Sequence, residues 1–328
     1  MIEIIKYIFN LNDKPLMLVP RLLDKDQKNA QNINARYLLP ELSNHFNVVA
    51  LYIKEFDKRK FKNLNLLRIS PIRIYPYFIF IFSIMPCDIF FYSGSQWFDY
   101  FALLIRKKLR IPGIVVTTFE GISYIDPKVK KNIEFVVGHS IYTMSLEATK
   151  YKIKILKLSD HIISISPFLQ FLAKNQFNKS ISYINIGYDK KIFYNDRTIK
   201  KKQKITIVAV GSLYDLKRPG FFLKIAKEVP EADFIWFGND RGELKKLQDQ
   251  IINFKLKNIS FRPEITQEKL AINFNQSHLF LMTSLSEGAP KVVLEAMACG
   301  LPTVLFGFYK PPFSINNKNS FLVWDDFE

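Results

Sequence analysis

Two glutamates and the loop between them carry the chemistry that this sequence shows most directly. Glu287 stands just before a predicted helix, and Glu295 lies five residues past Pro290 within it, about 7.5 Å along the helix axis. Carboxylates accept hydrogen bonds from pairs of hydroxyl groups, and backbone N–H groups at a helix N-terminus bind anions. Two carboxylates on either side of an anion site fit a molecule with a sugar at each end and a diphosphate between them. Two glutamates eight residues apart fit a solvated helix face as well, so the surrounding residues must decide.

The elements that position these glutamates follow the order strand, loop, helix. An apolar run at residues 279–282 predicts a strand that ends at the loop. Pro290 suits the first position of the helix, and Gly300 suits the position just past its end. Apolar residues recur along one side of residues 290–299, so we expect this helix to pack against a sheet.

The string from Ser284 to Pro302 resembles the donor-site motif of family 4 glycosyltransferases of the group 1 type, Ser-x-x-Glu-Gly-x-Pro-x4-Glu-Ala-x-Ala-x-Gly-x-Pro. The resemblance implies a retaining enzyme that uses a nucleoside diphosphate sugar. In such an enzyme Glu287 would hold the transferred sugar and be catalytic, while Glu295 would hold the ribose. The other donor-binding residues implied in this loop are Gly288, Ala289, Pro290 and Lys291.

A second loop is similar to the same family. The apolar run at residues 205–210 leads into Gly211 and Ser212, and then to Lys217 and Arg218. In the family, an Arg and a Lys of this loop contact the donor diphosphate. Lys217 matches the Lys, but Ser212 stands where the family has the Arg. We expect Gly211, Ser212 and Lys217 to line the diphosphate, with Arg218 supplying a second positive charge of different geometry.

The first half of the chain offers one more candidate, Glu120. It follows a predicted strand at residues 114–118, at a position where relatives often carry a His near the reacting sugar. A carboxylate there could accept a proton from an acceptor hydroxyl or hydrogen-bond the donor sugar. A solvated loop acid and a helix cap fit the sequence equally well. The glycine-rich loop of many relatives is missing, because residues 20–34 contain no glycine.

Strands and helices alternate along the chain, and the pattern starts anew after a polar, charged stretch at residues 187–204. This alternation predicts an α/β fold with parallel sheets covered by helices. The resemblance implies the GT-B fold, two Rossmann-like domains facing across a cleft. The domains would be residues 1–195, on the acceptor side, and residues 196–328, which bind the donor. The C-terminal helices usual in the family look missing or shortened.

Composition limits the partners and the location. Lys and Arg number 47 against 30 acids, a net charge of +17, which attracts phosphates and anionic lipids, although Lys-rich proteins could simply be the rule in the source. No nucleic-acid module accompanies this charge, so we expect no nucleic-acid partner. The expected partners are a nucleotide-sugar donor, a glycan or lipid-linked acceptor and an anionic membrane surface. The N-terminus lacks a secretory pattern, which predicts a cytoplasmic location, peripheral on the inner membrane face.

Neither a metal nor a cofactor is expected. The chain holds two cysteines and four histidines, and they form no cluster in the sequence. Asp24 and Asp26 match the Asp-x-Asp pattern of metal-dependent glycosyltransferases, but they lie too early in the chain to follow a completed sheet. In the GT-B class, Lys, Arg and a helix N-terminus neutralise the leaving diphosphate instead.

The leading hypothesis is transfer of a hexose to a glycan or lipid-linked hydroxyl with retention of configuration, in cell-surface polysaccharide synthesis. A nucleotide-sugar epimerase on the same fold is the second hypothesis, although such enzymes favour several histidines in the site. A truncated, inactive chain that binds nucleotide or polyanion is the third.

Overall fold

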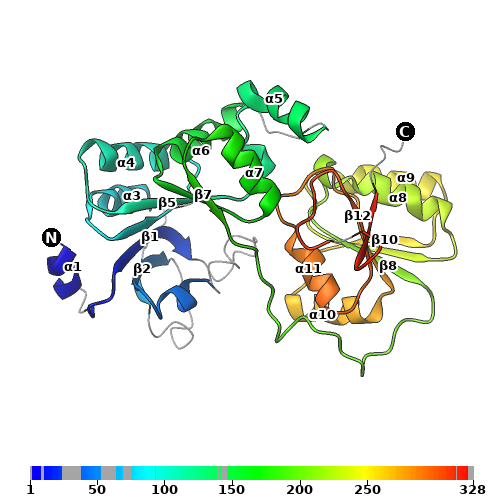
Figure 1. The fold of residues 1–328 in the computed structure, drawn as a ribbon. Coiled ribbons are helices and arrows are strands. Elements are labelled where there is room, and N and C mark those ends of the chain that lie inside the picture. Colours follow the sequence, from blue (N-terminus) through cyan, green and yellow to red (C-terminus); the bar gives the residue numbers. More distant parts are fainter. Residues whose placement is uncertain are drawn as a thin grey trace. The chain divides into compact units, whose positions relative to one another are not determined.

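A parallel β-sheet forms the middle of each half of the chain (Figure 1). The computed structural model describes residues 2–8, 11–23, 38–52, 64–68, 75–92, 94–138, 141, 146–314 and 316–323. Unit 1 consists of residues 1–138 and 143–184, and unit 2 consists of residues 139–142 and 185–328. Asp24 and Asp26 lie outside the described residues.

The sheet of unit 1 has seven strands in the order β3-β2-β1-β4-β5-β6-β7, and all neighbouring pairs are parallel. Because helices cover such a sheet, inner strands such as β2 (Asn47–Tyr52) and β4 (Ile89–Phe91) are nearly continuous apolar runs. The strands are β1 (Leu16–Leu23), β2 (Asn47–Tyr52), β3 (Asn65–Arg68), β4 (Ile89–Phe91), β5 (Ile114–Phe119), β6 (His161–Ser164) and β7 (Ser180–Tyr183).

The described helices of unit 1 include a layer formed by α3, α4 and α6, which packs on one face of the sheet (Figure 1). The core under this layer includes Leu18, Phe82, Leu103 and Ile155, each at most 1% exposed. The helices whose bounds are described are α1 (Ile2–Ile8), α3 (Tyr75–Ile84), α4 (Trp97–Lys108), the 3-10 helix η3 (Ile122–Tyr124), α5 (Pro127–Val137), α6 (Leu146–Leu158) and α7 (Pro167–Gln176).

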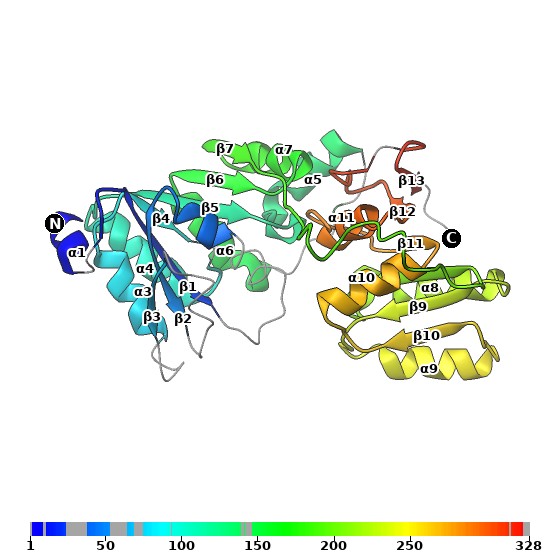
Figure 2. The ribbon, with the colours of Figure 1, turned by 90° about the horizontal axis from the view of Figure 1, so that it is seen from below.

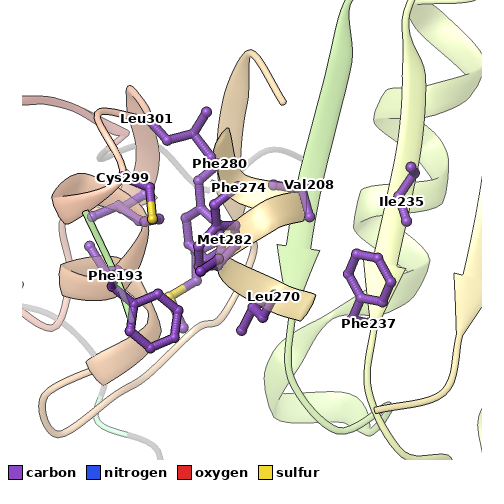
Figure 3. Close-up of a cluster of buried hydrophobic side chains, with 14 residues drawn as sticks. Phe193, Val208, Ile235, Phe237, Leu270, Phe274, Phe280, Met282, Cys299 and Leu301 are labelled. Carbon is purple, nitrogen blue, oxygen red and sulfur yellow. The ribbon is translucent and has the colours of Figure 1, made fainter. Parts of the chain in front are cut away.

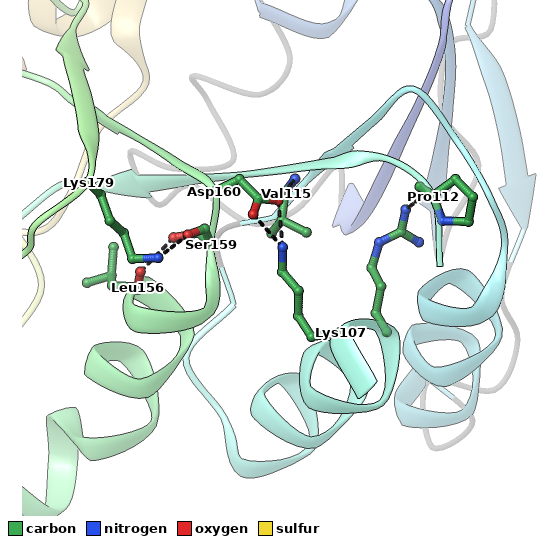
Figure 4. A network of polar contacts seen from close by, with 8 residues as sticks. Lys107, Pro112, Val115, Leu156, Ser159, Asp160 and Lys179 are labelled. Atoms are coloured by element: carbon green, nitrogen blue, oxygen red, sulfur yellow. Dashed lines mark hydrogen bonds and ion pairs between the residues drawn. The ribbon is translucent and has the colours of Figure 1, made fainter. Parts of the chain in front are cut away.

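Polar contacts tie this helical layer to the sheet (Figure 4). The Nζ of Lys107 in α4 lies 2.5 Å and 2.6 Å from the two carboxylate oxygens of Asp160, just before β6. The backbone N–H of Val115 in β5 donates to the same carboxylate at 2.8 Å. Asp160 therefore joins a helix to the edge where β5 and β6 begin, and these contacts keep its pKa below the usual value despite partial burial.

The sheet of unit 2 has six parallel strands in the order β10-β9-β8-β11-β12-β13. Figure 2 shows this sheet between its helices. The strands are β8 (Thr206–Val210), β9 (Asp233–Phe237), β10 (Ile259–Arg262), β11 (Leu279–Met282), β12 (Thr303–Phe306) and β13 (Ser320–Val323). The helices are the 3-10 helix η4 (Asp215–Lys217), α8 (Pro219–Glu228), α9 (Leu244–Asn253), α10 (Gln267–Gln276) and α11 (Lys291–Ala298).

One apolar cluster joins the sheet of unit 2 to α10 and α11 (Figure 3). Phe274 of α10 packs edge-to-face on Phe280 of β11, with ring centroids 5.8 Å apart. Phe193, from the segment that leads into unit 2, packs on Phe274 at 6.3 Å and is 1% exposed. Phe193 therefore covers the core of unit 2 from a segment outside the sheet.

The most apolar stretch of the sequence, residues 74–91, forms α3 followed by β4. Among the described residues, no helix combines the length and the apolar character that crossing a bilayer takes.

The helices α5 and α10 were missed from the sequence, although start signals precede both. Asp126 caps α5 and Thr266 caps α10, each through a side-chain oxygen that accepts a backbone N–H.

Candidate active site

The strand order of unit 2 reverses between β8 and β11, which are neighbours in the sheet. From β8 the chain proceeds outward to β9 and β10, and from β11 it proceeds the other way to β12 and β13. The loops that leave the carboxyl ends of β8 and β11 therefore diverge on opposite sides of the sheet. Doubly wound sheets bind ligands in the crevice at such a point. The loops concerned are residues 211–218 and 283–290, the two that the sequence motifs mark.

An ion pair connects these two loops. The Nζ of Lys217 donates a hydrogen bond to Oε1 of Glu287, and the side chains are 17% and 14% exposed. Lys217, predicted to bind the donor diphosphate, and Glu287, predicted to bind the transferred sugar, thus lie in direct contact although they are 70 residues apart in the sequence. The pair holds a positive and a negative group side by side in a partly dehydrated place.

Backbone contacts reinforce this connection. The hydroxyl of Thr283 donates to the carbonyl oxygen of Lys217 at 2.7 Å, and the N–H of Leu285 donates to the carbonyl oxygen of Leu216 at 3.0 Å. Thr283 is 1% exposed. Its role was not recognised in the sequence, because an isolated Thr at a strand end carries no signal of the loop it will touch.

The helix α11 begins one residue later than predicted. Pro290 is the N-cap, with φ −73° and ψ 99°, and Lys291 is the first helical residue. The extended ψ of Pro290 separates the loop from the helix. The predicted end is confirmed, because Gly300 adopts φ +73° just past Cys299. The buried side of α11 includes Val293 and Ala296, as the apolar pattern predicted.

Glu295 is a buried carboxylate on α11, and its side chain is 7% exposed. Its Oε1 lies 3.9 Å from the Nζ of Lys291, one turn earlier on the helix. Burial raises the pKa of Glu295 to about 7, and the positive charge of Lys291 opposes this rise. Burial also lowers the pKa of Lys291, while the charges of Glu295 and Asp189 act in the opposite direction.

Tyr309 and Ser286 also belong to the surroundings of Glu287, and neither was singled out from the sequence. Tyr309 is 1% exposed and its hydroxyl lies 3.6 Å from the Sδ of Met282. Burial raises the pKa of Tyr309 well above its usual value, and the negative charge of Glu287 adds to this. Ser286 is 4% exposed, and its Oγ finds no hydrogen-bond partner in the described part of the chain.

The side chain of Arg218 makes different contacts from that of Lys217. Its backbone lies in the left-handed region with φ +53°, between η4 and α8. Its guanidinium carbon lies 4.5 Å from the ring centre of Phe221 and 5.3 Å from that of Phe306. The guanidinium is therefore held by aromatic rings, and its Nη1 has no hydrogen-bond partner among the described residues. The expected phosphate role of Arg218 stays a prediction.

The turn after β8 is fixed by close backbone approach. The carbonyl oxygen of Gly211 accepts a hydrogen bond from Nε1 of Trp236 at 2.7 Å. A Cβ added to Gly238 would lie 1.8 Å from that same oxygen. Glycine is therefore required at position 238, where the turns after β8 and β9 touch. Ser212, next in the loop, is half-buried.

Glu120 belongs to unit 1, at the carboxyl end of β5. Its Oε1 accepts a hydrogen bond from the hydroxyl of Thr118 at 2.7 Å, and the side chain is half-buried. The helix-cap alternative does not describe it, because η3 has Gly121 as its N-cap. The donor-loop residues Gly288, Ala289 and Lys291 are half-buried and Pro290 is buried, all in unit 2.

The motif and the loop geometry agree with a match to a known family. Residues 190–324 match the family of glycosyl transferases group 1. This segment contains both loops that flank the strand reversal, and most of unit 2.

Two curated relatives extend the likeness beyond this group 1 segment. An uncharacterized glycosyltransferase of Haemophilus influenzae is 24% identical over 224 residues, 63% of this chain and 62% of the relative. An alpha-galactosylglucosyldiacylglycerol synthase of Streptococcus pneumoniae is 22% identical over 174 residues, 48% of this chain and 46% of the relative. The chain thus spans less than two thirds of either relative.

A solved structure resembles most of the chain. Alr3699/HepE of Anabaena, in complex with UDP and glucose, has a TM-score of 0.66 at 13% identity, covering 88% of this chain and 80% of that one. At this identity the likeness concerns the fold. The predicted GT-B fold, with two Rossmann-like units and parallel sheets, is confirmed.

Proposed function

We propose that this protein is a retaining glycosyltransferase that moves a hexose from a nucleoside diphosphate sugar to a hydroxyl of a glycan or lipid-linked acceptor. In this reaction the bond between the anomeric carbon and the diphosphate oxygen breaks, and the leaving diphosphate keeps the electron pair. A new bond forms between the anomeric carbon and the acceptor oxygen, which loses its proton.

The observation that carries the proposal is the ion pair of Lys217 and Glu287 at the strand reversal of the group 1 segment. An ammonium group there can neutralise the charge that develops on the leaving diphosphate. A carboxylate beside it can accept hydrogen bonds from hexose hydroxyls. The two groups are in contact in the structure, so a donor that binds between them replaces this ion pair with its own contacts to both side chains.

Glu295 and Lys291 form the other pair of the site. The first turn of α11 lies between Glu287 and Glu295, so a donor that spans both carboxylates places its diphosphate near the N-terminal amides of the helix. Glu295 would then accept hydrogen bonds from the ribose. The positive charge of Lys291, 3.9 Å from that carboxylate, favours the ionised form of Glu295 and opposes the effect of burial.

Glu120 is proposed to act on the acceptor side. It is hydrogen-bonded to Thr118 at the end of β5. A carboxylate held in one orientation is suited to accept the proton of an acceptor hydroxyl or to hydrogen-bond the donor sugar.

The names of similar proteins support particular substrates. HepE of Anabaena was solved with UDP and with glucose, which makes UDP-glucose the first donor to test. The pneumococcal relative is named for a glycosylated diacylglycerol, which favours a lipid-linked acceptor. A role in cell-surface polysaccharide synthesis, on the inner face of the membrane, fits both.

Donor hydrolysis without an acceptor tests the proposal. We expect Glu295→Ala to lower kcat/KM for UDP-sugar hydrolysis by about tenfold or more, because a buried carboxylate that holds the ribose is lost. The matched control is Glu231→Ala, since Glu231 is an exposed carboxylate in the connection between α8 and β9. It should hydrolyse the donor at the wild-type rate.

Two results would contradict the proposal. One is equal hydrolysis by wild type and Glu295→Ala over a panel of nucleotide sugars. The other is an epimerised nucleotide sugar formed without acceptor, detected by NMR, which would favour the epimerase. With an acceptor present, the anomeric configuration of the product decides whether transfer is retaining.

A further inference from the structure

The helical layer of unit 1 exposes large apolar side chains that the core does not use. Five of them lie on α3 and α4, and we call them the apolar surface: Tyr77, Ile81, Ile84, Trp97 and Phe101. Trp97 is 53% exposed and Phe101 is 44% exposed. The residues on α3 follow the spacing i, i+4, i+7, and those on α4 follow i, i+4. Each helix thus presents one apolar stripe outward, opposite its buried face.

Aromatic rings continue this surface from α4 to α6. The ring centroids of Trp97 and Phe101 are 6.4 Å apart, those of Tyr100 and Phe101 are 5.3 Å apart, and those of Tyr100 and Tyr151 are 6.1 Å apart. The ammonium of Lys154 lies 5.0 Å from the ring centre of Tyr100 and 5.7 Å from that of Tyr151. Aromatic rings that carry a polar or charged neighbour suit a boundary between water and an apolar phase.

The charged side chains described as exposed on this layer are positive. Lys108 is exposed at the C-terminal end of α4, and Lys154 is exposed on α6. Lys150, also on α6, lies beside Tyr151. Among the described side chains of α3, α4 and α6, only that of Asp99 is a carboxylate. It is 3% exposed and hydrogen-bonded by Tyr92. The exposed face therefore combines apolar and cationic groups, which complements an anionic lipid surface.

The apolar surface reaches the edge of the sheet where acceptor chemistry is proposed. The helix α4 begins directly after β4, so Trp97 in its first turn lies toward the carboxyl ends of the strands. Glu120 follows β5, the neighbour of β4, at the same edge. A layer seated on a membrane through Trp97 would place lipid headgroups beside this edge.

We propose that the outward face of α3, α4 and α6 is a seat for an anionic membrane surface, with Trp97 and Phe101 at headgroup level and Lys108, Lys150 and Lys154 on the lipid phosphates. The inference deepens the proposed function, because it rests on that function for the lipid-linked acceptor. Its test needs neither donor nor acceptor, so the two can fail separately.

Co-sedimentation of the full chain with vesicles tests the seat. The vesicles are equal mixtures of phosphatidylglycerol and phosphatidylcholine, and pure phosphatidylcholine serves for comparison. We expect binding to the anionic vesicles to exceed binding to the neutral ones by about tenfold, and the double variant Trp97→Ser, Phe101→Ser to lose about tenfold in affinity. The matched control is Ile252→Ser, Phe254→Ser, because these two apolar residues are exposed on or next to α9 in unit 2.

Trp97 also reports its own environment. The chain has two other tryptophans: Trp236 is 2% exposed, and Trp324 lies outside the described residues. We expect a blue shift of emission on adding anionic vesicles to disappear in Trp97→Phe and to persist in Trp324→Phe. Thermal unfolding of each variant checks folding. Substitutions at exposed positions should leave the melting temperature within a few degrees of the wild type.

Several outcomes would overturn the seat. These are binding equal for both vesicle types, equal loss in the α9 control, a blue shift that survives Trp97→Phe, or self-association of the chain that the Trp97→Ser, Phe101→Ser variant abolishes in the absence of lipid. Donor hydrolysis by that variant should equal the wild type. If hydrolysis fails in all variants and in the wild type while vesicle binding holds, the proposed function fails and the seat stands.

Discussion

At the scale of single residues, the ionisation of Glu295 makes the stability of the protein depend on pH. Its pKa in the folded chain is about 7, above the ordinary value of 4.5, because it is buried. Between these two pH values the folded chain holds a proton that the unfolded chain has lost. The stability of the protein therefore falls as pH rises from 4.5 to 7, and above 7 it carries the full cost of a buried charge.

Replacing Glu295 by Gln should separate stability from binding. Because Gln stays neutral, we expect Glu295→Gln to raise the free energy of unfolding by about 2 kcal/mol at about pH 8 and to have no such effect near about pH 4.5. Urea unfolding at both pH values measures this, with Glu231→Gln as the control. A gain of equal size at both pH values would contradict the assigned titration.

At the scale of elements, the turns after β8 and β9 position the loop that carries Lys217. Gly238 leaves no room for a side chain, since a Cβ there would lie 1.8 Å from the Gly211 oxygen and 2.6 Å from its carbonyl carbon. Both clashing atoms are backbone, so the turn itself must move. The strand end of β8 therefore depends on a glycine one strand away.

Gly238→Ala should destabilise the protein by about 2–4 kcal/mol and weaken UDP binding, because the displaced turn carries Lys217 with it. The matched control is Gly220→Ala, in the first turn of α8, where an added Cβ meets nothing within 4 Å. It should be neutral or slightly stabilising, since Ala favours a helix over Gly. Denaturant unfolding and calorimetric titration with UDP measure both effects. A Gly238→Ala protein as stable as Gly220→Ala would show that the turn has freedom not expected from its geometry.

At the scale of the whole molecule, the two units are separate cores with separate sheets. The donor loops belong to unit 2, and the apolar surface and Glu120 belong to unit 1. Ligand effects should therefore differ between the units.

Hydrogen exchange in the presence of UDP tests this division. We expect slower amide exchange in residues 211–218 and 283–290, which flank the proposed diphosphate, and unchanged exchange in β2 and β3 of unit 1. ATP serves as the control ligand, to separate nucleotide-specific protection from general anion binding. Protection confined to unit 1 would contradict the assignment of the donor site.

The sequence by itself determined the local parts of the site. The string from Ser284 to Pro302 specifies a strand end, a loop and a helix through contacts within a few residues, and Gly300 ends the helix as predicted. It also predicted the α/β class, because apolar periodicity is local. The family match and the fold likeness agree with both.

Only the tertiary structure decided which distant groups meet. Lys217 and Glu287 pair because β8 and β11, far apart in sequence, are neighbours where the strand order reverses. The burial that raises the pKa of Glu295, and the exposure of Trp97, likewise depend on what packs around them. Such long-range contacts are set by the packing of whole elements, and no local spacing encodes them.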